Sequence, residues 1–488
     1  MTRQNAFLVI AVLLAWRIVM AAILPLSADE AYYLLWSRHL QAGYFDHPPV
    51  IAFLIRAGTA LLGTTPLGVR LLGLPLSLLA TWFVWRTAAM LLHDTTSPTR
   101  AAQSGGGAVA GPGAGEGGGG EGRAAWAAVL FNLTLMANVE LLAATPDLPS
   151  IVTVAAFLWA LAKVRTRGEG HWWLAVGATA GLSLLSKYSM LFVGLGTAVW
   201  LLADKRGRAW LKTPWPWAGA LLALAVFAPN LLWQARHDWM TFAFQFGRID
   251  RGALTGRYLV EFAGAQLGLA TPLILVLAAM GWWRARRPGG DCFALFVIVG
   301  VTLLYFLQHA LHDRVQGNWP CFLYPALAVL AADARAPRWL SWSAAPVAGA
   351  MLLALYLQAA LGIVPLKHDP VARLLARDFP AAAQSVADSV PDGAVLTTDY
   401  ETTALLRYYQ PRLPVIQLNE PWRYDWAKPP SPALLKKPLV YFTATRRDRS
   451  ALVAPSFGLM SGALAHGPDY VGYLVEDPKP GAALGKVP

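Results

Sequence analysis

The sequence predicts a mainly α-helical, polytopic membrane protein with about 11 transmembrane helices and a small C-terminal α/β module. Three observations predict this fold class. Of the 488 residues, 56% are hydrophobic and only 14% are charged, whereas soluble domains carry roughly a quarter charged residues. Apolar runs of about 20 residues, the length that spans a bilayer, recur up to about residue 365. Beyond that point the runs stop and short strand-like and helix-like segments follow.

Eleven apolar segments are expected to cross the membrane. They are residues 6–26, 70–92, 124–143, 147–163, 171–186, 188–203, 214–233, 258–282, 292–311, 319–333 and 340–364. The first contains Arg17 and precedes ten others, so we interpret it as an uncleaved anchor and not as a signal peptide.

The Lys and Arg residues fall in short clusters between these segments and set the orientation. With the N-terminus in the cytoplasm, every such cluster lies in an inner loop, as the positive-inside rule requires. The net charge of +12 is then explained by topology, and we expect no nucleic-acid partner. Residues 101–122 are Gly-rich and predict a flexible cytoplasmic linker without catalytic content.

One further apolar stretch, residues 48–63, would reverse every later loop if it crossed the membrane. We therefore assign it to an interfacial helix within an outer loop of residues 27–69. Residues 366–488 form the outer α/β module, with expected helices at 371–390 and 401–409. Its expected strands lie at 394–398, 415–418 and 439–442. Because the module lacks a nucleophile-elbow or phosphate-loop motif, we interpret it as a lid or acceptor platform.

In this topology, the polar residues that could take part in catalysis or metal binding lie on the outer face. Asp29 and Glu30 follow the first span, and Asp46 with His47 lies further along the same loop. Such carboxylates suit a general base or a divalent metal site, although Asp29 could instead cap a helix from Glu30 to Leu40. Asp147, in a tight outer turn, could likewise cap a helix or face the same cavity.

Three outer cations are candidates for binding an anionic phosphate. Lys187 interrupts an apolar stretch, where a cation is costly unless it pairs or snorkels to the headgroups. Arg236 and Arg314 lie at outer span ends among aromatic residues, which interfacial aromatic belts also explain. The two cysteines, Cys292 and Cys321, are expected at opposite membrane faces and are not expected to form a disulfide.

Several of these segments together resemble bacterial family 39 glycosyltransferases. These are GT-C fold enzymes related to protein O-mannosyltransferases and to the aminoarabinose and galacturonic acid transferases of lipid A. The likeness spans roughly residues 1–365 and rests on motifs that occur in order. They are Asp29–Tyr33, Phe45–Pro49, Thr145–Asp147, Ser186–Tyr188, Pro229–Trp239 and Asn318–Pro320.

The resemblance implies that residues 1–365 form a GT-C transmembrane catalytic domain and that residues 366–488 form a periplasmic domain. It implies a multi-pass enzyme of the bacterial inner membrane with its active site on the periplasmic side, surrounded by membrane lipids. The enzyme would move a sugar, with inversion, from a polyprenyl-phosphate donor to an outer-face acceptor. The acceptor would be lipid A, another glycolipid, a glycan or a protein.

The resemblance also implies roles for individual residues. Asp29, Asp46 and Glu30 would be the catalytic carboxylates, with Asp29 as base or acceptor-positioning group. The donor phosphate would be bound by Lys187, His47, Arg314 and Arg236, with His47 standing where relatives often have Lys. The acceptor would contact Asp147, Tyr33 and Tyr44. A divalent Mg²⁺ or Mn²⁺ held by Asp29, Asp46 and Asp147 is left open, and no other cofactor is expected.

Other functions remain as alternatives. A lipid-linked sugar flippase or transporter would place ionisable groups near the membrane midplane, whereas here they are expected in outer loops. An O-antigen ligase-type enzyme would have its large outer loop between late spans. A scaffold that has kept Asp29 and Asp46 without using them is a third alternative.

Overall fold

A computed structural model describes residues 1–92, 118–247, 253–366, 368–428, 430–458, 464–467 and 469–475. The chain divides into two compact units. Unit 1 comprises Met1–Ala21, His47–Ile51 and Arg70–Tyr356, and unit 2 comprises Ala22–Asp46, Ala52–Val69 and Leu357–Pro488. Most of the outer loop therefore groups with the C-terminal module, which the sequence analysis does not anticipate.

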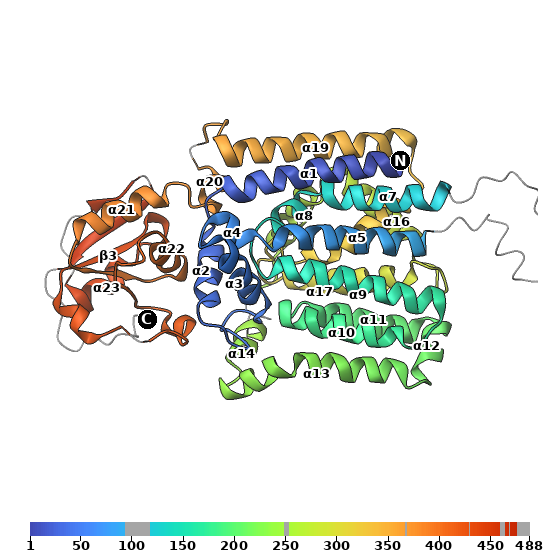
Figure 1. The fold of residues 1–488 in the computed structure, drawn as a ribbon, viewed down its shortest axis with the longest axis horizontal. Coiled ribbons are helices and arrows are strands. Elements are labelled where there is room, and N and C mark those ends of the chain that lie inside the picture. The colour runs from blue at the N-terminus through green and yellow to red at the C-terminus, as the bar shows by residue number, and fades with distance from the viewer. Residues whose placement is uncertain are drawn as a thin grey trace, which may run out of the picture. The chain divides into compact units, whose positions relative to one another are not determined.

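Unit 1 is helical, and its long helices lie side by side with nearly parallel axes (Figure 1). The helices of this part of the chain are α1 (Arg3–Ile23), α5 (Gly73–Leu91), α7 (Gly118–Leu133), α8 (Leu135–Glu140), α9 (Asp147–Arg167), α10 (Trp172–Ser186), α11 (Met190–Ala203), α12 (Lys205–Leu211), α13 (Trp215–Arg236), α14 (Met240–Phe246), α15 (Arg257–Leu269), α16 (Pro272–Arg284), α17 (Phe293–Ala310), α18 (Tyr324–Ala332) and α19 (Arg338–Leu361).

All eleven predicted segments are helical, and the expectation of a multi-pass membrane protein is confirmed. Within the described ranges, six helices are long and apolar enough to cross a membrane, or up to seven if a bent pair counts as one span. Other predicted spans, such as α10, α11 and α18, are shorter apolar helices. A short helix can still serve as a span where the bilayer thins around it or where the chain beside it extends the apolar length.

Two predicted segments differ from the structure in ways that have local causes. Residues 258–282 are not one helix, because α15 and α16 meet at an angle of 104°. Thr271 adopts φ +63° there and precedes Pro272, and a residue before proline is disfavoured in the helical region. The segment 124–143 breaks at Thr134, whose side chain caps α8 by accepting from the backbone N–H of Ala137 at 3.2 Å.

The Gly-rich segment 101–122 was predicted as linker throughout. Its residues 101–117 lie outside the described residues, and α7 begins at Gly118 inside it. The expected interfacial segment 48–63 does contain a helix, α3 (Val50–Leu62), and its place at the membrane surface stays a prediction.

Glycines allow the helices of unit 1 to pack closely. A Cβ atom on Gly177 of α10 would lie 2.0 Å from the carbonyl oxygen of Gly219 of α13. One on Gly281 of α16 would lie 1.7 Å from the carbonyl oxygen of Leu330 of α18. Small residues at such crossings let two helix backbones approach and gain van der Waals contact inside the membrane.

Unit 2 contains a mixed five-stranded sheet of order β2-β1-β3-β5-β4. The strands are β1 (Ala394–Thr397), β2 (Val415–Gln417), β3 (Leu439–Ala444), β4 (Leu464–Ala465) and β5 (Tyr470–Val475). Strands β2, β1 and β3 run parallel, whereas β5 pairs antiparallel with both β3 and β4. The predicted α/β module with three strands near these positions is confirmed.

Helices cover both faces of this sheet. Leu396, Ile416 and Tyr441 pack with Val453 and Phe457 of α23 (Ser450–Phe457). On the other face the Phe442 ring meets Phe379 of α21 (Phe379–Ser389), with 6.0 Å between centroids. This alternation follows from the two-residue period of a strand. The remaining helices of this part are α2 (Ala28–Ser37), α4 (Pro66–Arg70), α20 (Pro370–Leu374) and α22 (Tyr400–Tyr409).

The predicted helix 371–390 is two helices, α20 and α21. Between them Ala376 has φ +46°, a left-handed conformation that ends a right-handed helix. Pro380 then lies in the first turn of α21, where a residue without a backbone N–H is tolerated.

Candidate active site

The acidic pair of the first outer loop lies at the start of α2, which Ser27 caps. The Ser27 hydroxyl accepts a hydrogen bond from the backbone N–H of Glu30 at 3.3 Å. The Glu30 carboxylate in turn accepts from the Ser27 backbone N–H at 3.0 Å. This reciprocal arrangement is a capping box. The alternative in which Asp29 caps the helix is therefore wrong, and the buried Glu30 carboxylate has a structural task.

The loop that follows α2 is closed by an aromatic stack. The rings of Trp36 and Tyr44 lie parallel with centroids 4.2 Å apart, and both side chains are buried. The Tyr44 hydroxyl lies 3.0 Å from the carbonyl oxygen of His39 and accepts from the backbone N–H of Gln41 at 3.2 Å. Tyr33 is also buried and packs against Trp36 with ring centroids 4.8 Å apart. These contacts hold the loop that carries Asp46.

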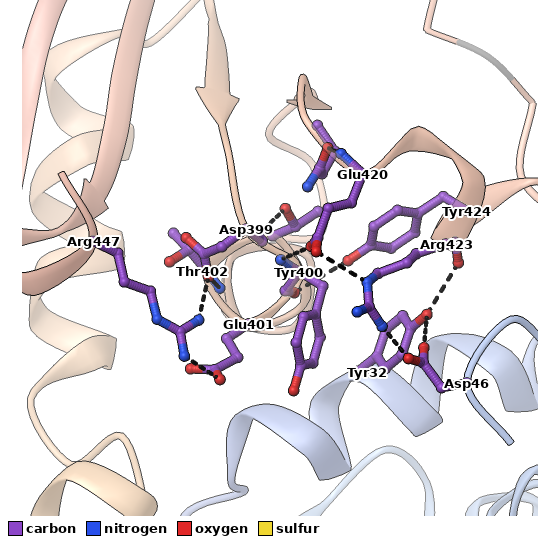
Figure 2. Close-up of polar contacts among 12 residues, drawn as sticks. Tyr32, Asp46, Asp399, Tyr400, Glu401, Thr402, Glu420, Arg423, Tyr424 and Arg447 are labelled. Atoms are coloured by element: carbon purple, nitrogen blue, oxygen red, sulfur yellow. Dashed lines mark hydrogen bonds and ion pairs between the residues drawn. The ribbon is translucent and has the colours of Figure 1, made fainter. Parts of the chain in front are cut away.

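Asp46 is buried and is held by the C-terminal module of the same unit. Its Oδ1 accepts a hydrogen bond from the Arg423 guanidinium and forms an ion pair with it. Its Oδ2 accepts from the Tyr32 hydroxyl at 3.0 Å, and this hydroxyl also lies 3.2 Å from the carbonyl oxygen of Arg423. Figure 2 shows the three side chains converging between α2 and the module. Both oxygens of Asp46 therefore have donors.

Arg423 is itself fixed on several sides. Its Nε lies 3.3 Å from Oε1 of Glu420, and its guanidinium lies over the rings of Phe45, at 5.1 Å, and Tyr400, at 4.7 Å. Burial alone would lower the pKa of Arg423, but the charges of Asp46 and Glu420 raise it above its usual value. Burial raises the pKa of Glu420, which Arg423 partly offsets. The guanidinium therefore stays charged and has partners on several sides.

Asp29 has a donor from the same module. The Tyr400 hydroxyl donates to Oδ1 of Asp29 at 2.9 Å, and the Tyr400 ring packs 5.1 Å from that of Tyr32. Tyr400 opens α22, whose cap is Asp399. Burial, and then the charge of Asp29, raises the pKa of Tyr400 well above its usual value. The hydroxyl therefore keeps its proton and acts as a donor to the carboxylate.

A second carboxylate cluster lies in unit 1 around Asp147, the first residue of α9. Oδ1 of Asp147 is paired with the Lys187 ammonium and lies 2.8 Å from the Cys321 thiol. Oδ2 accepts from the Asn318 amide at 3.0 Å. Asp147 does not cap α9 with its side chain. Lys187 therefore pairs with a carboxylate, and the role of Asp147 as a site carboxylate stays a prediction.

Arg17 of α1 is a residue of the helix bundle. It is buried and donates to the side-chain oxygens of Asn132 at 3.0 Å and Asn138 at 3.3 Å. Among the described side chains, its Nη2 atom has no hydrogen-bond partner. Cys292 and Cys321 are both free and buried.

The structure does not gather the remaining predicted phosphate ligands. Arg314 is mostly exposed and lies 3.3 Å from Glu261. Arg236 is an exposed residue at the end of α13. His47 is half-buried just before α3. Their binding of phosphate stays a prediction, as does the acceptor contact of Tyr33, Tyr44 and Asp147.

No group of three or more His, Cys, Asp or Glu side chains that could hold a metal ion is found within the ranges that the structure describes. Asp46, one of the three expected ligands, forms an ion pair with Arg423. The possible Mg²⁺ or Mn²⁺ site at Asp29, Asp46 and Asp147 stays a prediction.

The sequence analysis missed Tyr400 and Arg423. They lie 371 and 377 residues from the carboxylates they contact, in a module without an enzymatic motif. Arg423 had one signal, because it lies within the aromatic run Trp422–Trp426, a composition typical of sites where an arginine stacks on rings.

The chain resembles known glycosyltransferases in both sequence and fold. Residues 46–102 and 120–233 match the family model described as dolichyl-phosphate-mannose-protein mannosyltransferase. The lipid A galacturonosyltransferase RgtD of Rhizobium johnstonii is 27% identical over 343 residues. This alignment covers 68% of this chain and 65% of RgtD, slightly less than two thirds of that relative's length. The family resemblance inferred from the motifs is therefore confirmed.

Solved structures confirm the fold. The crystal structure of ArnT from Cupriavidus metallidurans bound to undecaprenyl phosphate has a TM-score of 0.66 at 15% sequence identity. It covers 97% of this chain and 98% of that chain. The apo structure of the same ArnT gives a TM-score of 0.61 at 16% identity, covering 96% and 97%. The expected GT-C fold with its small C-terminal module is thus correct.

Proposed function

From this resemblance and fold, we propose that the protein is a membrane glycosyltransferase that uses a polyprenyl-phosphate-linked sugar. The acceptor is a lipid A-type glycolipid, and the transfer takes place on the periplasmic side of the inner membrane. One observation carries the proposal. The two acidic residues of the outer loop motifs, on a fold shared with ArnT, are each held by a hydrogen-bond donor, the partly buried Tyr400 for Asp29 and the buried Arg423 for Asp46.

Asp29 is the general base in this proposal. The attacking group is an acceptor hydroxyl, which must lose its proton as the glycosidic bond forms. A carboxylate within hydrogen-bond reach of that hydroxyl can take the proton. Asp29 is half-buried, and the Tyr400 hydroxyl fixes the direction of its Oδ1. Asp46, whose two oxygens both accept from fixed donors, is less suited to take a proton.

The leaving group is a lipid phosphate, whose developing charge needs a nearby cation. Lys187 is the first candidate, since its ammonium is held by Asp147 at the end of a helix. A lysine bound by a single carboxylate keeps other donors for a phosphate. His47, Arg236 and Arg314 are further candidates. Direct displacement by the activated hydroxyl inverts the anomeric centre.

The direct test is turnover with defined donors. The purified protein is reconstituted in liposomes with undecaprenyl-phosphate sugars, namely galacturonic acid, aminoarabinose and mannose, together with lipid A. We expect released undecaprenyl phosphate and a lipid A product whose mass rises by one sugar. Movement of intact donor across the membrane without release of lipid phosphate would instead identify a flippase. Absence of both reactions with all three donors contradicts the proposal.

The anomeric outcome is tested separately. We expect NMR of the product to show the configuration opposite to that of the donor. Retention would indicate a covalent sugar–enzyme intermediate, which requires a second carboxylate as nucleophile.

A further inference from the structure

The C-terminal module provides side chains that hold the two acidic residues of the outer loop. Tyr400 and Arg423 come from this module, whereas Asp29 and Asp46 come from the chain around α2, and all four belong to unit 2. A lid or platform that only covered a site would not need such polar contacts, of which the one to Asp46 is buried and the one to Asp29 is partly buried. Buried polar groups are costly unless they are fully paired, so their presence here points to a specific task.

We propose that Arg423 and Tyr400 are positioning residues for transfer: Arg423 fixes the loop through Asp46, and Tyr400 aims the carboxylate of Asp29. This inference rests on the proposed function, because it assigns roles around the same site. It adds a division of labour between the two loop carboxylates. In this division Asp29 is the general base, whereas Asp46 holds its loop on the module through Arg423.

The contacts of Arg423 are those of a fixed link. The guanidinium is shared between Asp46 and Glu420 and lies over two aromatic rings. Its exposed side-chain fraction is 9%, and that of Asp46 is 12%, so water competes little for either group. An arginine held in this way loses its partner only if the loop moves.

A second arginine of the same module provides a matched comparison. Arg447 also bridges two carboxylates, with 2.6 Å to Oε1 of Glu401 and 3.3 Å to Oδ1 of Asp399. Both partners lie at the start of α22 and neither belongs to the outer loop. Figure 2 shows the two arginines on opposite sides of Tyr400. Arg447→Gln therefore removes a second arginine that bridges two carboxylates, with a more exposed side chain (32%) than Arg423, without touching Asp46.

Tyr473 is the corresponding comparison for Tyr400. Its hydroxyl donates to Oδ2 of Asp448 at 2.5 Å, between β5 and the segment before α23. Tyr473→Phe thus deletes a tyrosine–aspartate hydrogen bond elsewhere in the module. Tyr400→Phe deletes the bond to Asp29 and keeps the ring, which packs against Tyr32.

The first experiment measures turnover of the full-length variants in liposomes. We expect Arg423→Gln and Tyr400→Phe to lower kcat at least about tenfold with donor KM changed less than about threefold, since positioning acts on the bound complex. Arg423→Lys should recover part of the loss. Arg447→Gln and Tyr473→Phe should keep kcat within about threefold of wild type. Equal losses in the test and control variants would reduce the effect to general destabilisation and overturn the proposal.

The pairing of Arg423 with Asp46 is tested by a double-mutant cycle. Arg423→Gln leaves a buried unpaired carboxylate, whereas Asp46→Asn/Arg423→Gln leaves two neutral groups that can still hydrogen-bond. We expect the double variant to be at least as active as Arg423→Gln alone. If the activity losses of the two single variants multiply in the double variant, the two residues act independently. That result would refute the fixed link.

A last experiment does not depend on catalysis, so that it separates failure of this inference from failure of the proposed function. Hydrogen exchange is followed by mass spectrometry on peptides covering residues 38–46. We expect exchange there to be at least about tenfold faster in Arg423→Gln than in wild type, with no change in Arg447→Gln. Unchanged exchange in Arg423→Gln would overturn the role of Arg423 even if the enzyme is active.

Discussion

The molecule contains two buried carboxylate–cation clusters that are built differently. In unit 1, Asp147 is paired with Lys187, and its partners come from the helical bundle itself. In unit 2, Asp46 is paired with Arg423 of the C-terminal module, and the arginine is held by a second carboxylate and two rings. A lysine ammonium is a compact charge with rotatable donors, whereas arginine is a planar fork.

This difference indicates different tasks. Lys187 can turn part of its hydrogen-bonding capacity toward a ligand, because it is anchored on one side. Arg423 is anchored on several sides and is best suited to hold structure. We therefore expect the unit 1 cluster to be able to bind an anionic ligand and the unit 2 cluster to hold the loop that carries Asp46. The following predictions test this contrast.

The largest effect is expected for Asp29→Asn. The amide keeps the shape of the side chain and can still contact Tyr400, but it cannot take a proton. Loss of a general base typically costs about 10²–10⁴-fold in rate. Turnover of donor and acceptor in liposomes measures it. Wild-type turnover in this variant would place the chemistry elsewhere, for example at the unit 1 cluster.

The next effect concerns the stability of the unit 1 cluster. Lys187→Met leaves the Asp147 carboxylate buried without its main counter-charge, and removing one partner of a buried pair costs about 3–5 kcal/mol. Thermal unfolding in detergent should show a clearly lower midpoint. Asp147→Asn/Lys187→Met should be more stable than Lys187→Met, since no charge remains unpaired. Equal stability of wild type and Lys187→Met would show that the pair is not buried in the working protein.

The two units should also differ in their response to acid. His466 in the module is buried and lies 2.9 Å from the Ser385 hydroxyl, and burial lowers its pKa. Below about pH 6.5 the unfolded chain binds a proton that the folded module does not. The free energy of unfolding of the module should therefore fall by at most about 1.4 kcal/mol per pH unit.

Thermal unfolding at pH 7.5 and 5.5 measures this acid sensitivity, with His466→Gln as the comparison. We expect the variant to lose less stability than wild type over this range. An identical loss in both proteins would assign the acid response to other groups.

A smaller effect is expected for Glu30→Gln. A capping box accepts Glu or Gln at this position, so stability should change by about 1 kcal/mol or less. Turnover should stay close to wild type if Glu30 serves only the cap. A loss as large as that of Asp29→Asn would instead restore Glu30 to the catalytic set predicted from the sequence.

The smallest effect is expected for metal removal. Arg423 already provides a positive charge at Asp46, the position where a divalent ion was considered. Turnover after treatment with EDTA should remain within about twofold of the untreated enzyme. A loss that Mg²⁺ or Mn²⁺ restores would establish a metal site, and Asp29 and Asp147 would be the first ligands to test.

The sequence predicted the parts of the molecule that depend on local pattern. Apolar runs located every long helix of unit 1, and strand signals located β1, β2 and β3. Asp147 and Lys187 were both named, Asp147 because it lies in a tight outer turn and Lys187 because it interrupts an apolar stretch. Their pairing was not predicted, since spacing along the chain does not show which spans are neighbours.

The cluster of unit 2 depends on contacts that no local pattern encodes. Arg423 and Tyr400 are ordinary residues of a small module, and only folding brings them to Asp46 and Asp29. The bend at Thr271 was likewise missed, because a proline inside an apolar run ends a helix in some contexts and only kinks it in others.

The stack of Trp36 on Tyr44 has a consequence for affinity. A binding loop that is disordered before its ligand arrives loses conformational entropy on association. The cost is roughly 0.5–1.5 kcal/mol for each side chain that becomes ordered. Here the stacked rings already order the segment between α2 and Asp46 in the folded protein. An incoming sugar would thus meet a rigid rim, and discrimination between substrates would come from shape mismatch more than from the loop adapting to each of them.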